Sequence, residues 1–257
     1  MLEDKSIGLA LSGGGVRGMA HIGLIKAMRE HRIEAKVVSG TSVGALVGAL
    51  YANGNTAQDM LKFFKETPLF QYSFFTIIKP GFIDTERYSD IFKNFFPNNS
   101  FESLDKPLYV VATDLLSGKE KVFDKGELIK PLLASAALPP VFSPVEINNV
   151  LYADGGIMNN FPIEYVKDKS DFIIGSNVSV TVPVQKKDLR NSFQLTGRVT
   201  SLMIHASNDE KLHQCDLFIE PRELESIGVL DKKGIENAFN IGYEHASKVL
   251  EKMLSKS

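Results

Sequence analysis

Residues 37–50 read VVSGTSVGALVGAL, and this stretch decides the fold. The valines at its start predict a β-strand, and the small apolar residues at its end predict a helix that is buried on every side. Residues 40–44 join the two elements and form the pattern G-x-S-x-G. A strand that turns directly into a helix holds its central residue in a strained, exposed position. The pattern therefore predicts a nucleophile, Ser42, on a turn where Gly40 and Gly44 avoid collisions with the strand and the helix.

Ser42 has a simpler interpretation as well, because a serine at this position can cap the helix that starts at Val43. The G-x-S-x-G pattern also arises by chance in roughly one chain in ten of this length. The setting between a strand and a buried helix favours the nucleophile, since that setting is the one the motif requires.

The bulk composition limits the classes of protein to consider. The chain has 257 residues, which fits one large α/β domain over residues 1–257. A net charge of −2 gives no sign of a nucleic-acid partner. The single Cys215 excludes an intrachain disulfide and a cysteine metal cluster, and it fits a reducing compartment. The N-terminal residues lack the basic and apolar regions of a signal peptide, so we expect none there, and no run of ~18 apolar residues occurs in the sequence. We expect a cytoplasmic protein, with peripheral contact at the inner membrane face left open.

Short β-like runs alternate with helical patterns along the chain. This alternation predicts an α/β fold with a mainly parallel central sheet and helices on both faces. The expected strands lie at residues 6–12, 35–39, 106–115, 171–180 and 215–220. The expected helices lie at residues 17–31, 42–52, 127–138, about 190–209 and about 234–254.

The segment at about residues 55–101 differs in composition from the rest of the chain. Ten of the seventeen phenylalanines lie between residues 63 and 101, interrupted by three prolines. One interpretation is a helical insertion whose aromatic side chains fill a core. The other is an apolar lid or an acyl-chain wall over a site, in contact with lipid. Both can hold for different residues of the segment.

A glycine-rich loop, SGGGVRG, occupies residues 12–18 between a predicted strand and a predicted helix. Gly13, Gly15 and Gly18 match the dinucleotide fingerprint G-x-G-x-x-G, so a nucleotide-binding oxidoreductase is an alternative. That alternative needs an acidic residue at the end of the second strand to bind ribose. Glu34 lies before that strand, and the Ser42 turn ends it, so the fingerprint is disfavoured.

The same loop is better suited to an oxyanion hole. Gly14 and Gly15 have no side chains, so their backbone N–H groups can converge on a negative oxygen beside Ser42. This is possible because the glycine loop and the Ser42 turn follow adjacent strands of the predicted sheet. Arg17 adds positive charge next to the oxyanion or binds a lipid phosphate. The alternative for Arg17 is pairing with a buried carboxylate.

A serine nucleophile needs a general base. Asp154 follows an apolar run in VLYADGGIMNNFP, residues 150–162, and Gly155 and Gly156 let another backbone or a substrate approach. Taken alone, Asp-Gly is also a favoured pair for a hairpin turn. A triad of Ser42, Asp154 and His213 is a further alternative, although none of the five histidines lies in a comparable loop.

Four ordered motifs resemble the patatin-like phospholipase family: GGGVRG, GTSVG, ASAALPPVF and DGGIMNNFP. The resemblance spans about residues 6–250, and the segments ATDLLSGKEKVF and IENAFNIGYEHA are similar to the bacterial, single-domain members. It implies a three-layer α/β/α sandwich and the hydrolysis of acyl esters of lipids. By motif, Ser42 resembles the nucleophile, Asp154 the base, and Gly13, Gly14 and Gly15 the oxyanion loop.

The expected reaction is acyl transfer to water through an acyl-enzyme, without a metal or a cofactor. A free aspartate has a pKa near ~3.9 and is a weak base for an alcohol, so we expect burial to raise the pKa of Asp154. Phospholipid, lysophospholipid and simple carboxylic esters all stay open as substrates. A hydrolase-like scaffold with little turnover, used for regulation, is the remaining alternative.

Overall fold

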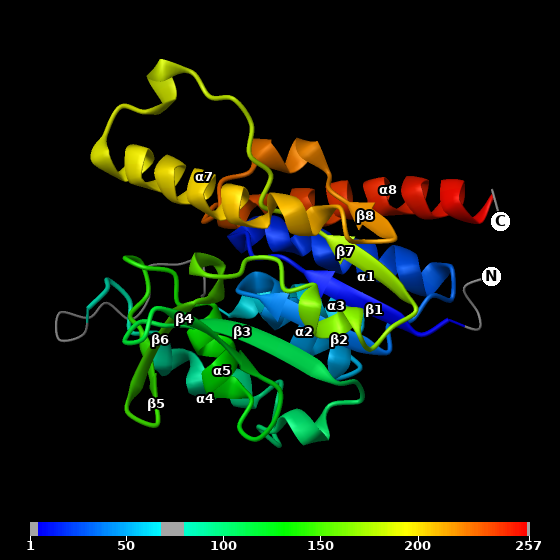
Figure 1. The fold of residues 1–257 in the computed structure, drawn as a ribbon, viewed down its shortest axis with the longest axis horizontal. Coiled ribbons are helices and arrows are strands. Elements are labelled where there is room, and N and C mark those ends of the chain that lie inside the picture. The colour runs from blue at the N-terminus through cyan, green and yellow to red at the C-terminus, as the bar shows by residue number, and fades with distance from the viewer. Residues whose placement is uncertain (1–4, 68–79, 256–257) are drawn as a thin grey trace.

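The computed structural model describes residues 5–67 and 80–255 (Figure 1). Within these residues eight strands form one sheet, in the order β5-β6-β3-β2-β1-β7-β8, with β4 also paired to β3. The parallel strands are β1 (Ile7–Leu11), β2 (Val37–Thr41), β3 (Leu108–Asp114), β7 (Phe172–Ser176) and β8 (Leu217–Ile219). The antiparallel strands are β4 (Lys119–Phe123), β5 (Val145–Ile147) and β6 (Val150–Asp154).

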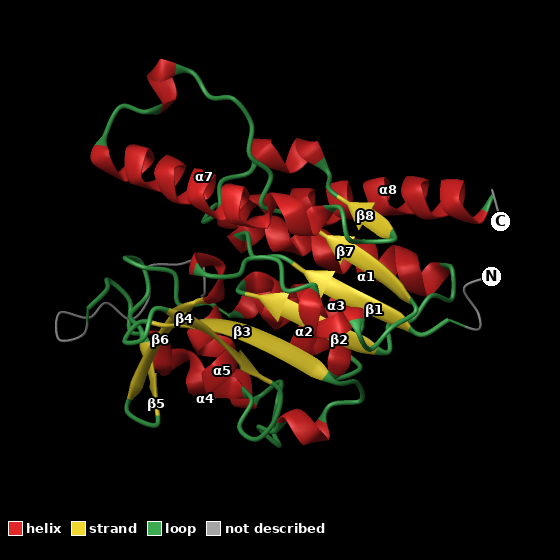
Figure 2. Ribbon diagram, in the orientation of Figure 1, coloured by secondary structure: helices red, strands yellow, loops and turns green. Residues whose placement is uncertain are grey.

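The helices cover both faces of the sheet, which confirms the predicted three-layer α/β/α sandwich with a mainly parallel sheet (Figure 2). A large apolar cluster packs several helices on one face, and a smaller cluster around Phe161 and Val166 packs on the other. The sequence indicates an apolar run at β6, but β4, β5 and the antiparallel direction of these strands were not predicted. The helices are α1 (Met19–Glu30), α2 (Val43–Ala52), α3 (Ala57–Glu66), α4 (Ser89–Lys93), α5 (Ile129–Ser135), α6 (Glu164–Lys167), α7 (Ser192–Leu212) and α8 (Ile235–Leu254).

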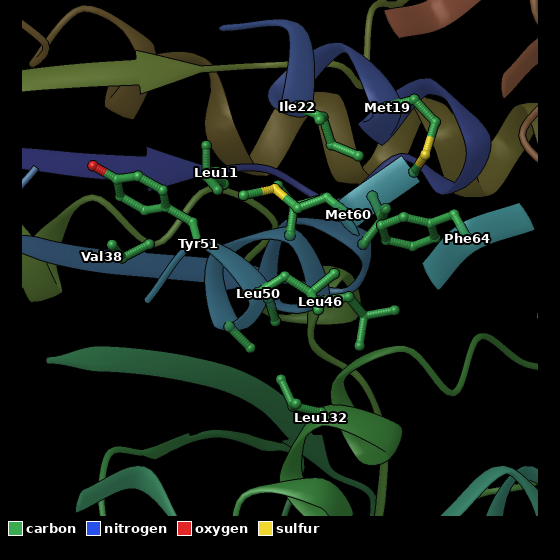
Figure 3. Close-up of a cluster of buried hydrophobic side chains, with 14 of the residues drawn as sticks. Leu11, Met19, Ile22, Val38, Leu46, Leu50, Tyr51, Met60, Phe64 and Leu132 are labelled. Atoms are coloured by element: carbon green, nitrogen blue, oxygen red, sulfur yellow. The ribbon is translucent and has the colours of Figure 1, made fainter. Parts of the chain in front are cut away.

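Helix α2 lies in the middle of the fold, as the apolar sequence of residues 43–52 predicts. All ten of its residues are buried, and the helix ends at Ala52, followed by Asn53 as the cap and Gly54 at a φ of 80°. Leu46 and Leu50 point toward Leu132 of α5, while side chains of α1 and α3 surround the rest of the cluster (Figure 3). A helix enclosed in this way fixes the position of its own first residue, and therefore of the turn that precedes it.

The strand order places a topological switch point beside β1. The chain continues from β1 to β2 and β3 on one side, whereas β7 and β8 lie on the other side. Loops that leave the carboxyl ends of two such strands run in opposite directions, so they open a crevice where ligands bind in open α/β sheets. The carboxyl ends of β1, β2 and β7 point toward the end of the molecule from which α7 projects (Figure 2).

The described part of the Phe-rich segment contains both kinds of environment that the sequence left open. Phe63 is buried and makes edge-to-face contacts with three other phenylalanine rings at centroid distances of 4.8–5.1 Å. Phe82, by contrast, is 54% exposed and lines a cavity. Phe70, Phe74 and Phe75 lie outside the described residues. The role of the segment as a lid therefore stays a prediction.

No helix in residues 5–67 or 80–255 combines the length and the apolar content that crossing a membrane requires.

Replacing Phe63 by alanine should lower the free energy of unfolding by roughly 3–5 kcal/mol, because it empties a fully enclosed aromatic site. Phe82→Ala, in the same segment, should cost far less, since that ring is mostly exposed. Urea unfolding followed by circular dichroism measures both. Equal losses for the two variants would mean that the exposed ring also belongs to the core.

Candidate active site

Ser42 lies on a strained turn between β2 and α2. Its φ of 54° and ψ of −127° fall in a region that non-glycine residues rarely adopt, so the backbone carries strain at this residue. Its side chain makes no capping hydrogen bond to α2, which removes the capping interpretation. The Ser42 Oγ instead donates a hydrogen bond of 2.6 Å to Oδ2 of Asp154.

The two glycines of this turn stand where a side chain has no room. A Cβ atom on Gly40 would lie 2.5 Å from the carbonyl carbon of Gly44, and one on Gly44 would lie 2.4 Å from the carbonyl oxygen of Leu11. These distances are too short for real contacts, so either substitution would push the turn away from α2 or from β1. The close approach of these elements is what holds Ser42 in place.

Asp154 ends β6 and begins a short 3₁₀ turn, Gly155–Ile157. The chain does not return as a hairpin at this point, so the hairpin interpretation of Asp154-Gly155 is wrong. The carboxylate is only 4% exposed, and its Oδ1 accepts a hydrogen bond of 2.8 Å from the N–H of Gly156. Its other oxygen is the one that meets Ser42, so both oxygens are held in fixed directions.

Burial raises the pKa of Asp154 to about 6, against the smaller opposing effects of the hydrogen bonds from Ser42 and Gly156. Desolvation disfavours the charged form of a carboxyl group, whereas hydrogen bonds donated to it favour that form. At neutral pH the group is therefore ionised, yet it is a stronger base than an exposed aspartate. This is the direction that the sequence analysis required of a general base.

The glycine loop leaves β1 and passes beside Ser42. The N–H of Gly13 donates a hydrogen bond of 3.2 Å to the carbonyl oxygen of Asn160. In the part of the chain that the structure describes, no acceptor is found for the N–H groups of Gly14 and Gly15. Gly15 has a φ of 60°, and a Cβ atom there would lie 2.1 Å from the carbonyl oxygen of Val229. Gly14, Gly15, Ser42 and Asp154 line one cavity.

His21, to which the sequence analysis gave no role, holds the start of this loop by a hydrogen bond to Ser12. The ring is fully buried on α1, with Nε2 2.9 Å from the carbonyl oxygen of Ser12 and Nδ1 2.9 Å from Oγ of Ser176. Because a carbonyl oxygen can only accept, Nε2 carries the proton and Nδ1 accepts from the hydroxyl. Burial lowers the pKa of His21 to about 4, so the ring is neutral at physiological pH.

Ser135 and Asn160 are further residues of the site that the sequence analysis missed. The Ser135 hydroxyl accepts a hydrogen bond of 2.8 Å from the N–H of Ser42 and donates one of 2.6 Å to the carbonyl oxygen of Val111. The Asn160 side chain donates to Ser179, whose hydroxyl donates 2.7 Å to the carbonyl oxygen of Gly13. Both residues lie inside motifs quoted from the sequence, but nothing in their spacing indicates these bonds.

Arg17 lines the cavity and binds backbone carbonyl groups. Its guanidinium donates to the carbonyl oxygens of Ile227 at 2.7 Å, Val180 at 3.2 Å and Glu225 at 3.3 Å. Burial lowers the pKa of Arg17, and the charge of Glu225 opposes that effect. None of these acceptors is a carboxylate, so Arg17 joins the loop after β7 to the loop after β8. A contact of Arg17 with an oxyanion or a phosphate stays a prediction.

The alternative sites find little support in the geometry. His213 is exposed at the C-terminal end of α7, and no histidine is among the described residues that line the cavity. Glu34 precedes β2 and so lies at the opposite end of that strand from Ser42. Gly18 packs against Val43, and a Cβ atom on Gly155 would lie 2.2 Å from the carbonyl oxygen of Val111, so both glycines serve close packing.

The cavity above Ser42 has a volume of about 720 Å³ and two chemically different walls. One wall is aromatic and aliphatic, and the other consists of small hydroxyl-bearing residues of α7. The first is lined by Leu46, Phe82, Tyr88, Phe92, Leu133, Leu138 and Phe142, and the second by Ser192, Thr196, Thr200 and Ser201. Such a cavity suits a molecule with an apolar chain and a polar end. No group of three or more metal-ligating side chains is found in residues 5–67 and 80–255.

Comparisons with known proteins agree on one family. The family model for patatin-like phospholipases matches residues 9–167. An uncharacterized NTE family protein of Mycobacterium tuberculosis is 34% identical over 184 residues, which cover 71% of this chain and 49% of that protein. The patatin-like phospholipase domain-containing protein 7 of Rattus norvegicus is 30% identical over 203 residues, covering 73% of this chain and 14% of that protein.

Among solved structures, VipD from Legionella pneumophila has a TM-score of 0.64 at 14% identity, covering 97% of this chain and 67% of that chain. This likeness concerns the fold. The chain spans about half the length of the mycobacterial relative.

Asp154→Asn should stabilise the protein at neutral pH. Because the pKa of Asp154 is higher in the folded than in the unfolded chain, its contribution to stability is full below about pH 4 and is lost as the pH rises through about 6. The amide keeps the shape and removes the buried charge, which destabilises the fold by about 3 kcal/mol at neutral pH. Thermal melts from pH 4 to 8 should show a rise in Tm at pH 7.5 that shrinks toward pH 4.

Asp124→Asn is the matched control for this measurement, because Asp124 is an exposed aspartate and should leave Tm unchanged. A Tm below that of the wild type at every pH would show that the Asp154 carboxylate holds the fold together.

Proposed function

The chain belongs to the patatin-like phospholipase family, and we propose that it is a serine acyl-ester hydrolase acting on lipids. The observation that carries this proposal is the 2.6 Å hydrogen bond from Ser42 to a buried carboxylate beside an apolar cavity. Acyl transfer needs a hydroxyl nucleophile, a base in contact with it, and amides that can bind an oxyanion. The strained turn of Ser42, the carboxylate of Asp154 and the unpaired amides of the glycine loop lie at one cavity and fit these roles.

In the first half of the reaction, the Ser42 proton moves to Oδ2 of Asp154 while Oγ attacks the ester carbonyl carbon. The carbonyl oxygen becomes an oxyanion, and the N–H groups of Gly14 and Gly15 donate hydrogen bonds to it. Gly13 positions the loop, because its own N–H is used by Asn160. The intermediate then collapses, the bond to the alcohol breaks, and Asp154 returns its proton to the leaving oxygen.

In the second half, water replaces the alcohol. Asp154 takes a proton from the water as its oxygen attacks the acyl carbon, and the same two amides stabilise the second oxyanion. The Ser42 Oγ then leaves the acyl group and recovers its proton from Asp154, so the enzyme is unchanged and the acid is released. The fixed hydrogen bond from Gly156 keeps the carboxylate oriented through both halves.

The walls of the cavity indicate the substrate class. The acyl chain fits the aromatic and aliphatic wall around Phe92 and Leu133, where its burial is favourable. The alcohol part then faces α7 and the loop after β8, where hydroxyl groups and Asp231 line the cavity. Phospholipids, lysophospholipids and simpler lipid esters all have this division.

Ser42→Ala should lower kcat for a soluble p-nitrophenyl ester by about 10⁴- to 10⁶-fold, because it removes the nucleophile. Asp154→Asn should cause a large loss as well, while His213→Ala should keep wild-type turnover. A fluorophosphonate probe should label native wild-type protein at Ser42 and fail to label the unfolded protein. Labelling without ester turnover would favour the regulatory scaffold, and loss of activity in His213→Ala would favour a triad.

The value of kcat/KM should rise with pH through about 6 and then level off, because only the ionised Asp154 can accept the proton of Ser42. Initial rates with the same soluble ester from pH 4 to 8 measure this. A profile that is flat across this range would mean that another group is the base.

A further inference from the structure

Helix α7 presents one face to the cavity and another to solvent. It projects beyond the end of the sheet, on the side where the carboxyl ends of β1, β2 and β7 point (Figure 1). The cavity face carries residues spaced by four, namely Ser192, Thr196, Thr200 and Ile204. These residues fall on one side of the helix because four residues make slightly more than one turn.

The adjoining face of α7 carries an exposed apolar stripe, formed by Leu195, Val199, Leu202 and Met203. These four side chains are between 43% and 68% exposed. Their spacing of four, seven and eight residues places them in one line along the helix. Such a line normally faces the core of a globular protein, and an exposed line rimmed by polar residues marks a surface that binds something.

The segment that leads into the helix and carries the stripe is positively charged, although the whole chain carries a net charge of −2. Residues 184–206 contain Lys186, Lys187, Arg190 and Arg198 but only one acidic residue, Asp188. The first three cations are exposed in the segment that leads into the helix. An apolar line with lysine and arginine beside it is the pattern of helices that lie in the interface of an anionic membrane.

Exposed apolar side chains are also found among the residues that line the cavity. Phe82 and Val229 line the cavity and are themselves substantially exposed. They come from two segments other than α7, so exposed apolar side chains border the cavity at more than one place. A lipid surface in contact with the stripe would therefore lie next to the entrance that a lipid substrate must use.

We propose that α7 docks the protein on an anionic lipid bilayer. The apolar stripe enters the boundary between headgroups and acyl chains, and the cations of residues 186–198 contact lipid phosphates. A second copy of the chain is a weaker occupant, because pairing two such stripes would bring two sets of cations together. The role of the bilayer as a substrate source rests on the proposed function, whereas docking itself does not.

The test uses the full chain with Ser42→Ala, so that no lipid is consumed, and sedimentation with large unilamellar vesicles. Vesicles of phosphatidylcholine with 30% phosphatidylglycerol should bind the protein, and pure phosphatidylcholine should bind it at least about tenfold more weakly. Adding Leu202→Glu with Met203→Glu should lower the partition coefficient by about tenfold or more. Replacing Lys186, Lys187 and Arg190 by glutamine should remove the preference for phosphatidylglycerol and its dependence on salt.

Leu254→Glu is the matched control, because Leu254 is a 38% exposed leucine at the far end of α8. It should bind vesicles like the parent. Equal binding by the stripe variant and the parent, or no binding by the parent, overturns the proposal. A dimer in light scattering that separates on Leu202→Glu with Met203→Glu, without vesicle binding, overturns it in favour of self-association.

A second measurement separates docking from catalysis. With Ser42 intact, the stripe variant should hydrolyse a soluble short-chain ester like the wild type and should lose activity only on vesicle lipid. Its melting temperature should match that of the wild type, because the four side chains are solvent-exposed. If the wild type did not hydrolyse the soluble ester, the proposed function would be refuted, and the vesicle-binding result would still stand.

Discussion

The contact between Ser42 and Asp154 is the constraint on which the rest of the site depends. Ser42 directly follows β2 and Asp154 ends β6, and β3 lies between those two strands in the sheet. β3 pairs with both, and it also holds Ser135 through the carbonyl oxygen of Val111. One central strand therefore sets the spacing between the hydroxyl and the carboxylate, which a loop could not fix as closely.

The site combines a serine on a strained backbone with a buried carboxylate, and both are unfavourable for stability. The enclosed helix α2 and the glycine contacts keep the backbone of Ser42 in its unusual conformation. Neutral His21 holds the start of the glycine loop through the carbonyl oxygen of Ser12, and the Ser12 hydroxyl donates a further hydrogen bond to the carbonyl oxygen of Gly13. This network contains no ion pair, so its geometry depends little on salt.

Much of this arrangement could be read from local pattern. The strand before Ser42, the buried helix after it and the mainly parallel sheet follow from periodicity and glycine placement. The antiparallel strands β4 and β5 could not be predicted, because their sequences are short and half polar. The bonds of His21, Ser135 and Asn160 were also beyond prediction, since each joins residues that are close only after folding.

The layout of the sheet also decides where neighbours can be attached. The start of β1 and the end of α8 lie together at one end of the molecule, and the loops that surround Ser42 lie at the other (Figure 1). A polypeptide fused before the first strand or after the last helix would emerge away from the mouth of the cavity. Such a fusion would leave the side of the fold that holds Ser42 uncovered.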